Sequence, residues 1–145
     1  MEKPVLSGEA VLLNARVSDK ESAIRLAGRL LVENGFVEEA YIDKMLERET
    51  VTSTYIGNHV AIPHGTEEGK RLVKAPGISI VQIPEGVDFG DGRVAKLVVG
   101  IAGKGDEHLQ ILSNIALVCS DPEKVEKIVQ AQSKEALLSF FDEVN

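Results

Sequence analysis

The stretch GISIVQIPEGVDFGDGRVAKLVVGI, residues 77–101, contains two apolar runs on either side of a segment rich in turn-forming residues. The runs GISIVQI and VAKLVVGI are too short and too rich in β-branched residues to favour helices. The segment PEGVDFGDG between them has the Gly, Pro and Asp residues that are typical of turns. The stretch therefore predicts two strands, and shorter β-type runs occur at TSTYI (52–56) and VAIP (60–63).

Helical patterns lie on both sides of these strands. Ser18 and Glu21 have the spacing of a capping box before an apolar pattern of helical period, and Gly35 provides a stop, so we expect a helix over 19–34. The residue order predicts an α/β sandwich with a central mixed β-sheet flanked by helices. We expect the other helices over 38–49, over 106–119 with burial on most sides, from Asp121 and Pro122 onward, and over 134–143.

Length and composition limit the class of protein. The 145 residues fit a single domain over 1–145, and 43% hydrophobic residues without a long apolar run predict a globular protein that does not insert into a membrane. We expect a cytoplasmic protein, because the N-terminus has no secretory signal and the single cysteine, Cys119, cannot form an internal disulfide. Cys119 itself fits a buried helical position. A net charge of −7 argues against a nucleic-acid partner.

The segment GNHVAIPHGTEEGK, residues 57–70, places a histidine between a proline and a glycine. Pro63 favours an extended approach, so His64 should lie at the end of a short strand. Gly65 permits a close approach to the backbone, and Thr66 adds a hydroxyl and an N–H. Such an imidazole suits a nucleophile for an anionic electrophile. The alternative is a turn whose histidine has no chemical role.

The segment GIAGKGDEHLQIL, residues 100–112, predicts a strand, a glycine-rich loop and the start of a helix. Free N–H groups at that helix start favour an anion in the crevice beyond the strand. The segment is neither a Walker A loop nor a dinucleotide fingerprint. His108 lies in the first helical turn and could face this crevice, although from the residues alone a solvated histidine is the simpler interpretation.

Taken together, these residues resemble the IIA components of the mannitol/fructose class of the bacterial sugar phosphotransferase system. The resemblance is closest to stand-alone mannitol-specific members, and it covers nearly the whole chain. Its Pro-His-Gly-Thr sequence, followed some forty residues later by a glycine-rich loop with Glu and His, is distinctive. The matching segments are TSTYIGNHVAIPHGT (52–66), PEGVDFGDG (84–92) and VVGIAGKGDEHLQIL (98–112).

The resemblance implies a phosphoryl carrier that needs no cofactor. His64 would accept a phosphoryl group from the phosphohistidine of HPr and pass it to a cysteine of the IIB domain of a mannitol permease. His108 would donate a hydrogen bond to a phosphoryl oxygen, and Arg48 would balance phosphoryl charge. From the residues alone, a solvated arginine at a helix end remains an alternative for Arg48. Gly65 and Thr66 would support the phosphoryl pocket.

Asn58 is a departure from this family, because some members carry a glutamate at the corresponding position. We expect Asn58 to support the phosphoryl pocket only as a hydrogen-bonding group, and His59 to be a surface residue. Two other functions remain open. One is a regulatory module that controls a partner protein through the same phosphorylatable histidine. The other is a metal site, which the sequence does not favour because its histidines and acids lack a recognised ligand spacing.

Overall fold

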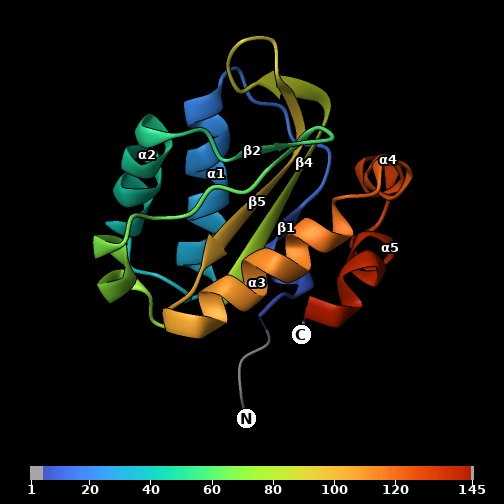
Figure 1. Cartoon of the computed structure of the whole chain (residues 1–145). Helices are drawn as coiled ribbons and strands as arrows, with labels where there is room; N and C mark the ends of the chain where they lie inside the picture. The colour runs from blue at the N-terminus through green and yellow to red at the C-terminus, as the bar shows by residue number, and fades with distance from the viewer. Residues whose placement is uncertain (1–4, 145) are drawn as a thin grey trace.

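A five-stranded mixed sheet lies between two layers of helices in the computed structural model (Figure 1), which describes residues 5–144 apart from the side chains of 105–108 and 142–144. This arrangement confirms the predicted α/β sandwich. The elements are β1 (Val11–Leu12), α1 (Lys20–Glu33), α2 (Tyr41–Val51), β2 (Tyr55–Gly57), β3 (Val60–Ala61), β4 (Gly77–Asp88), β5 (Val94–Ala102), α3 (Gly105–Val118), α4 (Pro122–Gln130) and α5 (Lys134–Leu138), with 3-10 helices at Gly8–Ala10, Glu68–Leu72 and Ser139–Val144.

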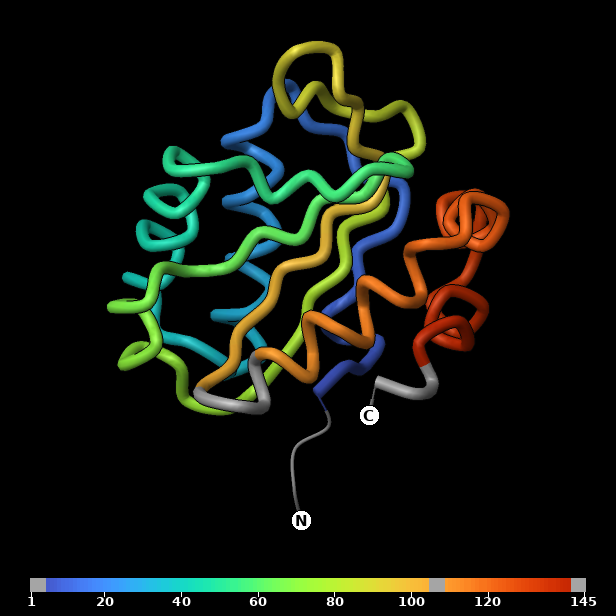
Figure 2. Tube along the Cα trace, viewed as in Figure 1, coloured from blue at the N-terminus to red at the C-terminus, as the bar shows by residue number. Residues whose placement is uncertain are grey.

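The strands are ordered β1-β4-β5-β3-β2 across the sheet. The long strands β4 and β5 form an antiparallel pair at its centre, whereas β1 runs parallel to β4 and β3 runs parallel to β5. Figure 2 shows the chain after β3 running beside the end of β5. Because parallel strands end at the same edge of a sheet, residues that follow β3 and residues that follow β5 meet there.

The two faces of the sheet are covered by different helices. Side chains alternate between the faces along a strand, so Ile78 and Ile80 of β4 pack with α3, α4 and α5, whereas Val81 and Ile83 pack with α1 and α2. Each face therefore has its own apolar core. Among the described residues, no helix is both long enough and apolar enough to cross a membrane.

Helices α1 and α2 pack closely where Gly28 meets α2. A Cβ atom at Gly28 would lie 2.8 Å from Ile42 Cγ1, so a larger residue would push the helices apart. Helix α1 begins one residue later than the capping-box prediction. Its N-cap is Asp19, whose carboxylate accepts a hydrogen bond from the Ser22 N–H at 2.8 Å, so Ser18 is not the cap.

Helix α3 differs from its prediction, because its burial is one-sided. Ile111 and Ile115 face the sheet, but the residues Leu109 and Leu117 are 63% and 68% exposed. The helix lies on the outer surface of its layer (Figure 1), so only one side of it is covered. Cys119, just after α3, is in the core as expected, and its burial raises the pKa of its thiol to about 12.

Two other predicted boundaries were wrong. Strand β4 continues past Ile83 to Asp88 with a register shift between Gln82 and Val87, and an irregularity of this kind accommodates Pro84, which has no N–H to donate. The helix predicted over 134–143 is split into α5 and a 3-10 segment. The backbone leaves helical geometry at Phe141, whose side chain is buried in the core.

Candidate functional site

His64 lies at the carboxyl end of β3, beside the end of β5. The Ile101 N–H donates to the Pro63 carbonyl oxygen at 3.0 Å, and His64 itself forms an isolated parallel bridge with Ile101. The pairing with β5 therefore extends beyond the two residues of β3. It fixes the backbone of His64 at the edge of the sheet where β5 gives way to the loop before α3.

The ring of His64 has a defined tautomer when it is neutral. Its Nδ1 atom lies 2.8 Å from the Ile62 carbonyl oxygen. Because a carbonyl oxygen only accepts hydrogen bonds, Nδ1 carries the proton and the lone pair of the neutral ring is on Nε2. The imidazole is half-buried, so a nucleophilic nitrogen is combined with a restricted ring orientation.

Burial lowers the pKa of His64 below its ordinary value of 6.5. The hydrogen bond to Ile62 and the negative charge of Glu49 oppose this effect, while the positive charge of Arg48 adds to it. The net shift is downward. At neutral pH the ring is therefore largely unprotonated, which is the form that has a lone pair to attack an electrophile.

A pocket of about 350 Å³ opens beside His64. It has both cationic and apolar walls, because Arg48 and Lys70 line it together with two leucines of α3. Lys70 is paired with Glu67 at 3.1 Å. The pocket thus suits a small anion that arrives on an apolar protein surface. Its lining is Tyr41, Arg48, His64, Gly65, Thr66, Glu67, Lys70, Gly103, Leu109 and Leu112.

The structure brings Arg48 to His64, as the resemblance implied. Arg48 lies in the last turn of α2, and its Nη1 donates to the Thr52 carbonyl oxygen at 2.9 Å. This contact holds the side chain, and because the carbonyl is neutral it does not cancel the charge of the guanidinium. The effect of that charge on the pKa of His64 indicates that it acts across the pocket.

Gly65 and Thr66 also line the pocket, but their polar groups have partners within the protein. The Gly65 N–H donates to the Tyr41 hydroxyl at 2.9 Å, and the Thr66 hydroxyl accepts from the Gly69 N–H at 3.2 Å. The space beside the Gly65 backbone, which the absence of a side chain leaves, is filled by the Tyr41 ring and not by a ligand. In this structure the Gly65 N–H is therefore not an open donor toward the pocket.

Asn58 does not lie in the pocket, so its predicted role there was wrong. It lies in the turn between β2 and β3, at the other end of β3 from His64, where it lines a separate cleft of about 1140 Å³. Its Nδ2 donates to the carbonyl oxygens of Cys119 and Ser120 at 3.1 and 3.3 Å. Asn58 thus caps the C-terminal end of α3. His59 is exposed, as expected, and also lines this cleft.

We predict that Asn58→Asp lowers the free energy of unfolding by about 1 kcal/mol. The carboxylate has no N–H to donate, and its charge faces carbonyl oxygens at the negative end of a helix. Asn14→Asp is a matched control, because Asn14 has nearly the same left-handed backbone (φ 53° against 52°) and lines the same cleft, without the α3 contact. Urea unfolding measures both. Equal stability of the two variants would contradict the capping role.

His108 lies within the first turn of α3, but its side chain is outside the described residues. Gly103 and Leu109, on either side of that turn, both line the His64 pocket. The backbone of the predicted strand, loop and helix start therefore lies beside the His64 pocket. The orientation of the His108 imidazole toward a phosphoryl group remains a prediction.

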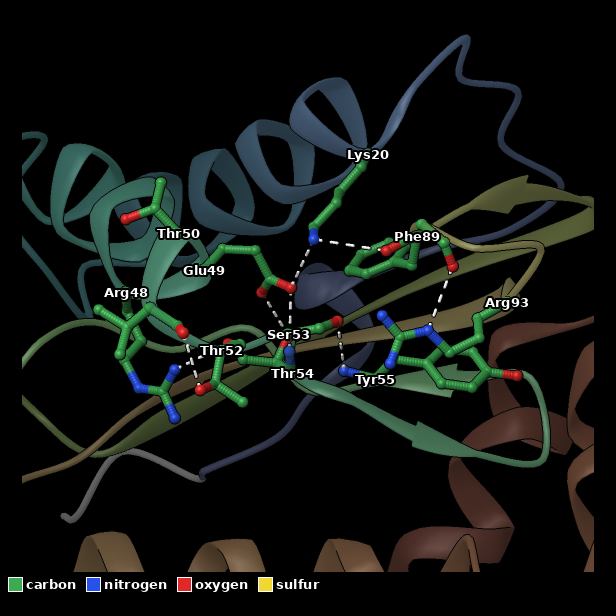
Figure 3. A network of polar contacts seen from close by, with 12 residues as sticks. Lys20, Arg48, Glu49, Thr50, Thr52, Ser53, Thr54, Tyr55, Phe89 and Arg93 are labelled. Carbon is green, nitrogen blue, oxygen red and sulfur yellow. Dashed lines mark hydrogen bonds and ion pairs between the residues drawn. The ribbon is translucent and has the colours of Figure 1, made fainter.

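Two residues of the site region were not predicted to have a role there, Tyr41 and Glu49. Glu49 is almost fully buried and joins three segments: it accepts from the Thr54 N–H and hydroxyl at 2.9 and 2.7 Å, and it pairs with Lys20 at 3.0 Å (Figure 3). Its spacing of four residues from Met45 places it on the buried face of α2. That periodicity was the signal that could have identified it.

Among the side chains that the structure describes, no group of three or more His, Cys, Asp and Glu residues is arranged to hold a metal ion. The groups that the structure describes at this edge of the sheet include an imidazole with its lone pair on Nε2, a neighbouring guanidinium and an apolar rim. Such a set can accept and release a small anionic group without covalent help from other residues.

A neutral imidazole with its lone pair on Nε2, beside an arginine in a small pocket with an apolar rim, fits the class of proteins that carry an anionic group between partners. Residues 4–144 match the family of the phosphoenolpyruvate-dependent sugar phosphotransferase system, EIIA 2, and the chain belongs to this family. The resemblance stated from the sequence is therefore confirmed. Membership makes the chain a IIA component that works through a phosphohistidine intermediate.

Individual relatives cover the whole chain. It is 60% identical over 145 residues to the mannitol-specific phosphotransferase enzyme IIA component of Geobacillus stearothermophilus, with 100% of both chains covered. The crystal structure of IIA mannitol from Escherichia coli matches with a TM-score of 0.88 and 38% identity, covering 94% of this chain and 98% of that one. A complex of IIA and phosphorylated IIB for mannitol from Escherichia coli matches with a TM-score of 0.89 and 38% identity, covering 94% and 96%.

Proposed function

We propose that His64 accepts a phosphoryl group from the phosphohistidine of HPr and passes it to a cysteine of the IIB domain of a mannitol permease. The observation that carries this proposal is the His64 tautomer. The Nδ1 proton is held by the Ile62 carbonyl, which leaves the Nε2 lone pair to attack phosphorus. Family membership supports the reaction class, and the Nδ1 hydrogen bond supports Nε2 of His64 as the reacting atom.

In the first step, Nε2 of His64 attacks the phosphorus of the donor in line with the donor's N–P bond. A new N–P bond forms as the old one breaks, and the electron pair of the old bond returns to the donor imidazole. The phosphorylated His64 ring keeps its Nδ1 proton and so carries positive charge. The Ile62 carbonyl stabilises this form through the same hydrogen bond.

In the second step, the thiolate of the IIB cysteine attacks the phosphorus carried by His64. An S–P bond forms, the Nε2–P bond breaks, and its electron pair restores the neutral imidazole. Phosphoryl transfer has a loose transition state, so the protein contributes positioning and charge stabilisation. We assign charge stabilisation to Arg48, which lines the pocket, and a hydrogen bond to the phosphoryl group to His108.

The names of the relatives support mannitol as the sugar and IIB as the acceptor. The relative from Geobacillus stearothermophilus is named as mannitol-specific, and the Escherichia coli IIA protein is bound to phosphorylated IIB for mannitol. HPr as the donor follows from the family. We also propose that residues 1–145 form one IIA domain that works in the cytoplasm.

The partners would dock on the apolar rim of the pocket. Leu109 is 63% exposed at the rim, and the partly buried Leu112 lies one turn further along α3. An exposed leucine at a reactive site favours contact with another protein, since burial of its side chain is favourable. The relay requires release after each transfer, so the interface should be small, at under roughly 1,200 Å².

We predict that Leu109→Glu raises the KM for phosphorylated HPr by about tenfold, because it places a charge in an apolar interface. Leu117→Glu is the matched control, since Leu117 is similarly exposed at the other end of α3 and does not line the pocket. Steady-state transfer with varied HPr measures the effect. An equal rise in KM for both variants would contradict a docking surface centred on the pocket.

The proposed function is tested by incubating the chain with phosphoenolpyruvate, enzyme I and HPr, followed by intact-mass measurement. We expect a gain of one acid-labile phosphoryl group, which is lost when the IIB domain for mannitol is added and retained when a IIB domain for another sugar is added. Transfer only to another sugar's IIB domain would overturn the assignment to mannitol. Failure to gain a phosphoryl group would overturn the carrier function. Gain of the group without transfer to any sugar-specific IIB domain would favour the regulatory module.

A further inference from the structure

Tyr41 connects the segment that carries His64 to the end of β5. Its side chain is buried, with 2% of the residue exposed. Its hydroxyl lies 2.9 Å from the Gly65 nitrogen and 2.9 Å from the Ile101 carbonyl oxygen. The buried Tyr41 hydroxyl thus contacts both Gly65, which follows His64, and Ile101, the residue of β5 with which His64 pairs.

The directions of these two hydrogen bonds follow from the groups involved. The Gly65 N–H only donates, so the Tyr41 oxygen accepts from it. The Ile101 carbonyl only accepts, so the Tyr41 hydroxyl donates its proton there. Burial raises the pKa of Tyr41 to about 12, so the phenol keeps that proton at any pH at which the protein would work. The hydroxyl therefore keeps a proton to donate to the Ile101 carbonyl oxygen while it accepts from the Gly65 N–H.

The Tyr41 ring fits closely against Gly65. A Cβ atom at Gly65 would lie 2.6 Å from Cε1 of the ring and 2.8 Å from Cζ, which is too close for any side chain. The glycine after His64 is thus required by the ring, and the ring and hydroxyl together fix the peptide that links His64 to Gly65. Arg48 follows Tyr41 by two helical turns on α2, so the same helix supports both the histidine and the arginine.

We propose that Tyr41 is a positioning residue for phosphoryl transfer, holding the His64–Gly65 peptide against β5 so that Nε2 of His64 lies in line with the incoming and departing groups. This inference rests on the proposed role of His64. In-line transfer depends on geometry more than on covalent chemistry, so a loss of the hydroxyl changes the rate of transfer without changing the docking surface.

The test compares Tyr41→Phe with the wild-type chain, with Tyr55→Phe as the matched control. Tyr55 is the only other tyrosine of the sequence, and its hydroxyl accepts from the His59 N–H in the cleft at the other end of β3. We expect Tyr41→Phe to lower kcat for transfer from phosphorylated HPr by about tenfold to a hundredfold, with KM unchanged. Tyr55→Phe should keep the wild-type kcat.

A second readout reports on His64 directly. Imidazole nitrogen shifts of the three histidines distinguish the two neutral tautomers, and we expect Tyr41→Phe to lose the single Nδ1–H form of His64. An unchanged kcat and tautomer in Tyr41→Phe would overturn the inference, as would an equal fall of kcat in Tyr55→Phe. A wild-type chain that accepts no phosphoryl group would overturn the proposed function itself, which is a distinct result.

A measurement on the wild-type chain keeps the inference testable if Tyr41→Phe does not fold. The Gly65 amide should exchange slowly with solvent, because it donates to a buried hydroxyl although its residue lines an open pocket. Exchange as fast as that of an exposed loop amide would overturn the inference. Slow exchange would support it.

Discussion

His64→Ala is expected to take up no phosphoryl group from phosphorylated HPr, under conditions in which the wild-type chain is fully converted. The substitution removes the Nε2 lone pair, and no other histidine with a described side chain lines the pocket. Loss of the nucleophile removes the covalent step as a whole rather than slowing it. Intact mass after incubation with phosphoenolpyruvate, enzyme I and HPr measures the result.

His59→Asn is the control for this experiment, because His59 is exposed in the cleft at the other end of β3 and asparagine tolerates its left-handed backbone. We expect this variant to be phosphorylated like the wild-type chain. Phosphorylation of His64→Ala, or its loss in His59→Asn, would contradict the assignment of the acceptor.

The pH dependence of acceptance follows from the same histidine. Burial lowers the pKa of His64 below 6.5, and only the neutral ring attacks phosphorus. The rate should therefore rise with pH, with a midpoint below 6.5, and then level off. Because the folded-state pKa is depressed, the buried ring also stabilises the fold less as pH falls below 6.5, where the unfolded chain binds more protons.

Glu49→Ala is expected to lower the free energy of unfolding by about 3 kcal/mol, because it leaves buried polar groups without a partner. The Glu49 side chain is 4% exposed and bonds with Lys20 and with the backbone and side chain of Thr54. Its removal would also loosen the segment after α2, where Thr52 holds Arg48. Transfer activity should fall along with stability.

Glu47→Ala is the control, because Glu47 lies on the same helix and pairs with Lys44 at the surface with 58% of its side chain exposed. A surface pair of this kind contributes about 0–1 kcal/mol, so this variant should unfold almost like the wild-type chain. Urea unfolding of both variants provides the comparison. Similar losses of stability would contradict the special role of the buried carboxylate.

The contribution of Glu49 to the free energy of unfolding should be present at neutral pH and be lost in acid. Burial alone would raise the pKa of Glu49, but hydrogen bonds from Thr54, Lys20 and Ser53 together outweigh it, and the pKa lies below 4.5. A depressed carboxyl pKa stabilises the fold above the unfolded value of 4.5, and this contribution is lost as pH falls through the folded value. The difference between wild type and Glu49→Ala should shrink in acid.

The sequence predicted the sheet and the placement of His64 because these depend on local patterns. The β-branched runs at 77–83 and 94–101, and the rigid approach through Pro63, all lie within short windows. The convergence of β5, its loop and the start of α3 on His64 was an implication of the family resemblance. Parallel strand ends and helix starts meet at one edge of a mixed sheet, so this follows from topology.

The failures came from contacts between distant segments. The cap formed by Asn58 joins residues about sixty positions apart, and the Tyr41 hydroxyl reaches Ile101 across a similar separation. No local pattern reveals such partners. The apolar pattern of α3 predicted burial on most sides, because leucines in such a helix are normally buried. Leu109 instead belongs to the exposed rim of the pocket.

Cys119 has a practical consequence for experiments on the relay. It is the only cysteine of the sequence, its side chain is buried, and its burial keeps the thiol protonated with a pKa of about 12. Thiolates react with maleimides and disulfides, whereas a buried neutral thiol does not. A cysteine introduced at an exposed position would therefore be labelled alone, so a fluorophore could follow partner binding without removal of the natural cysteine.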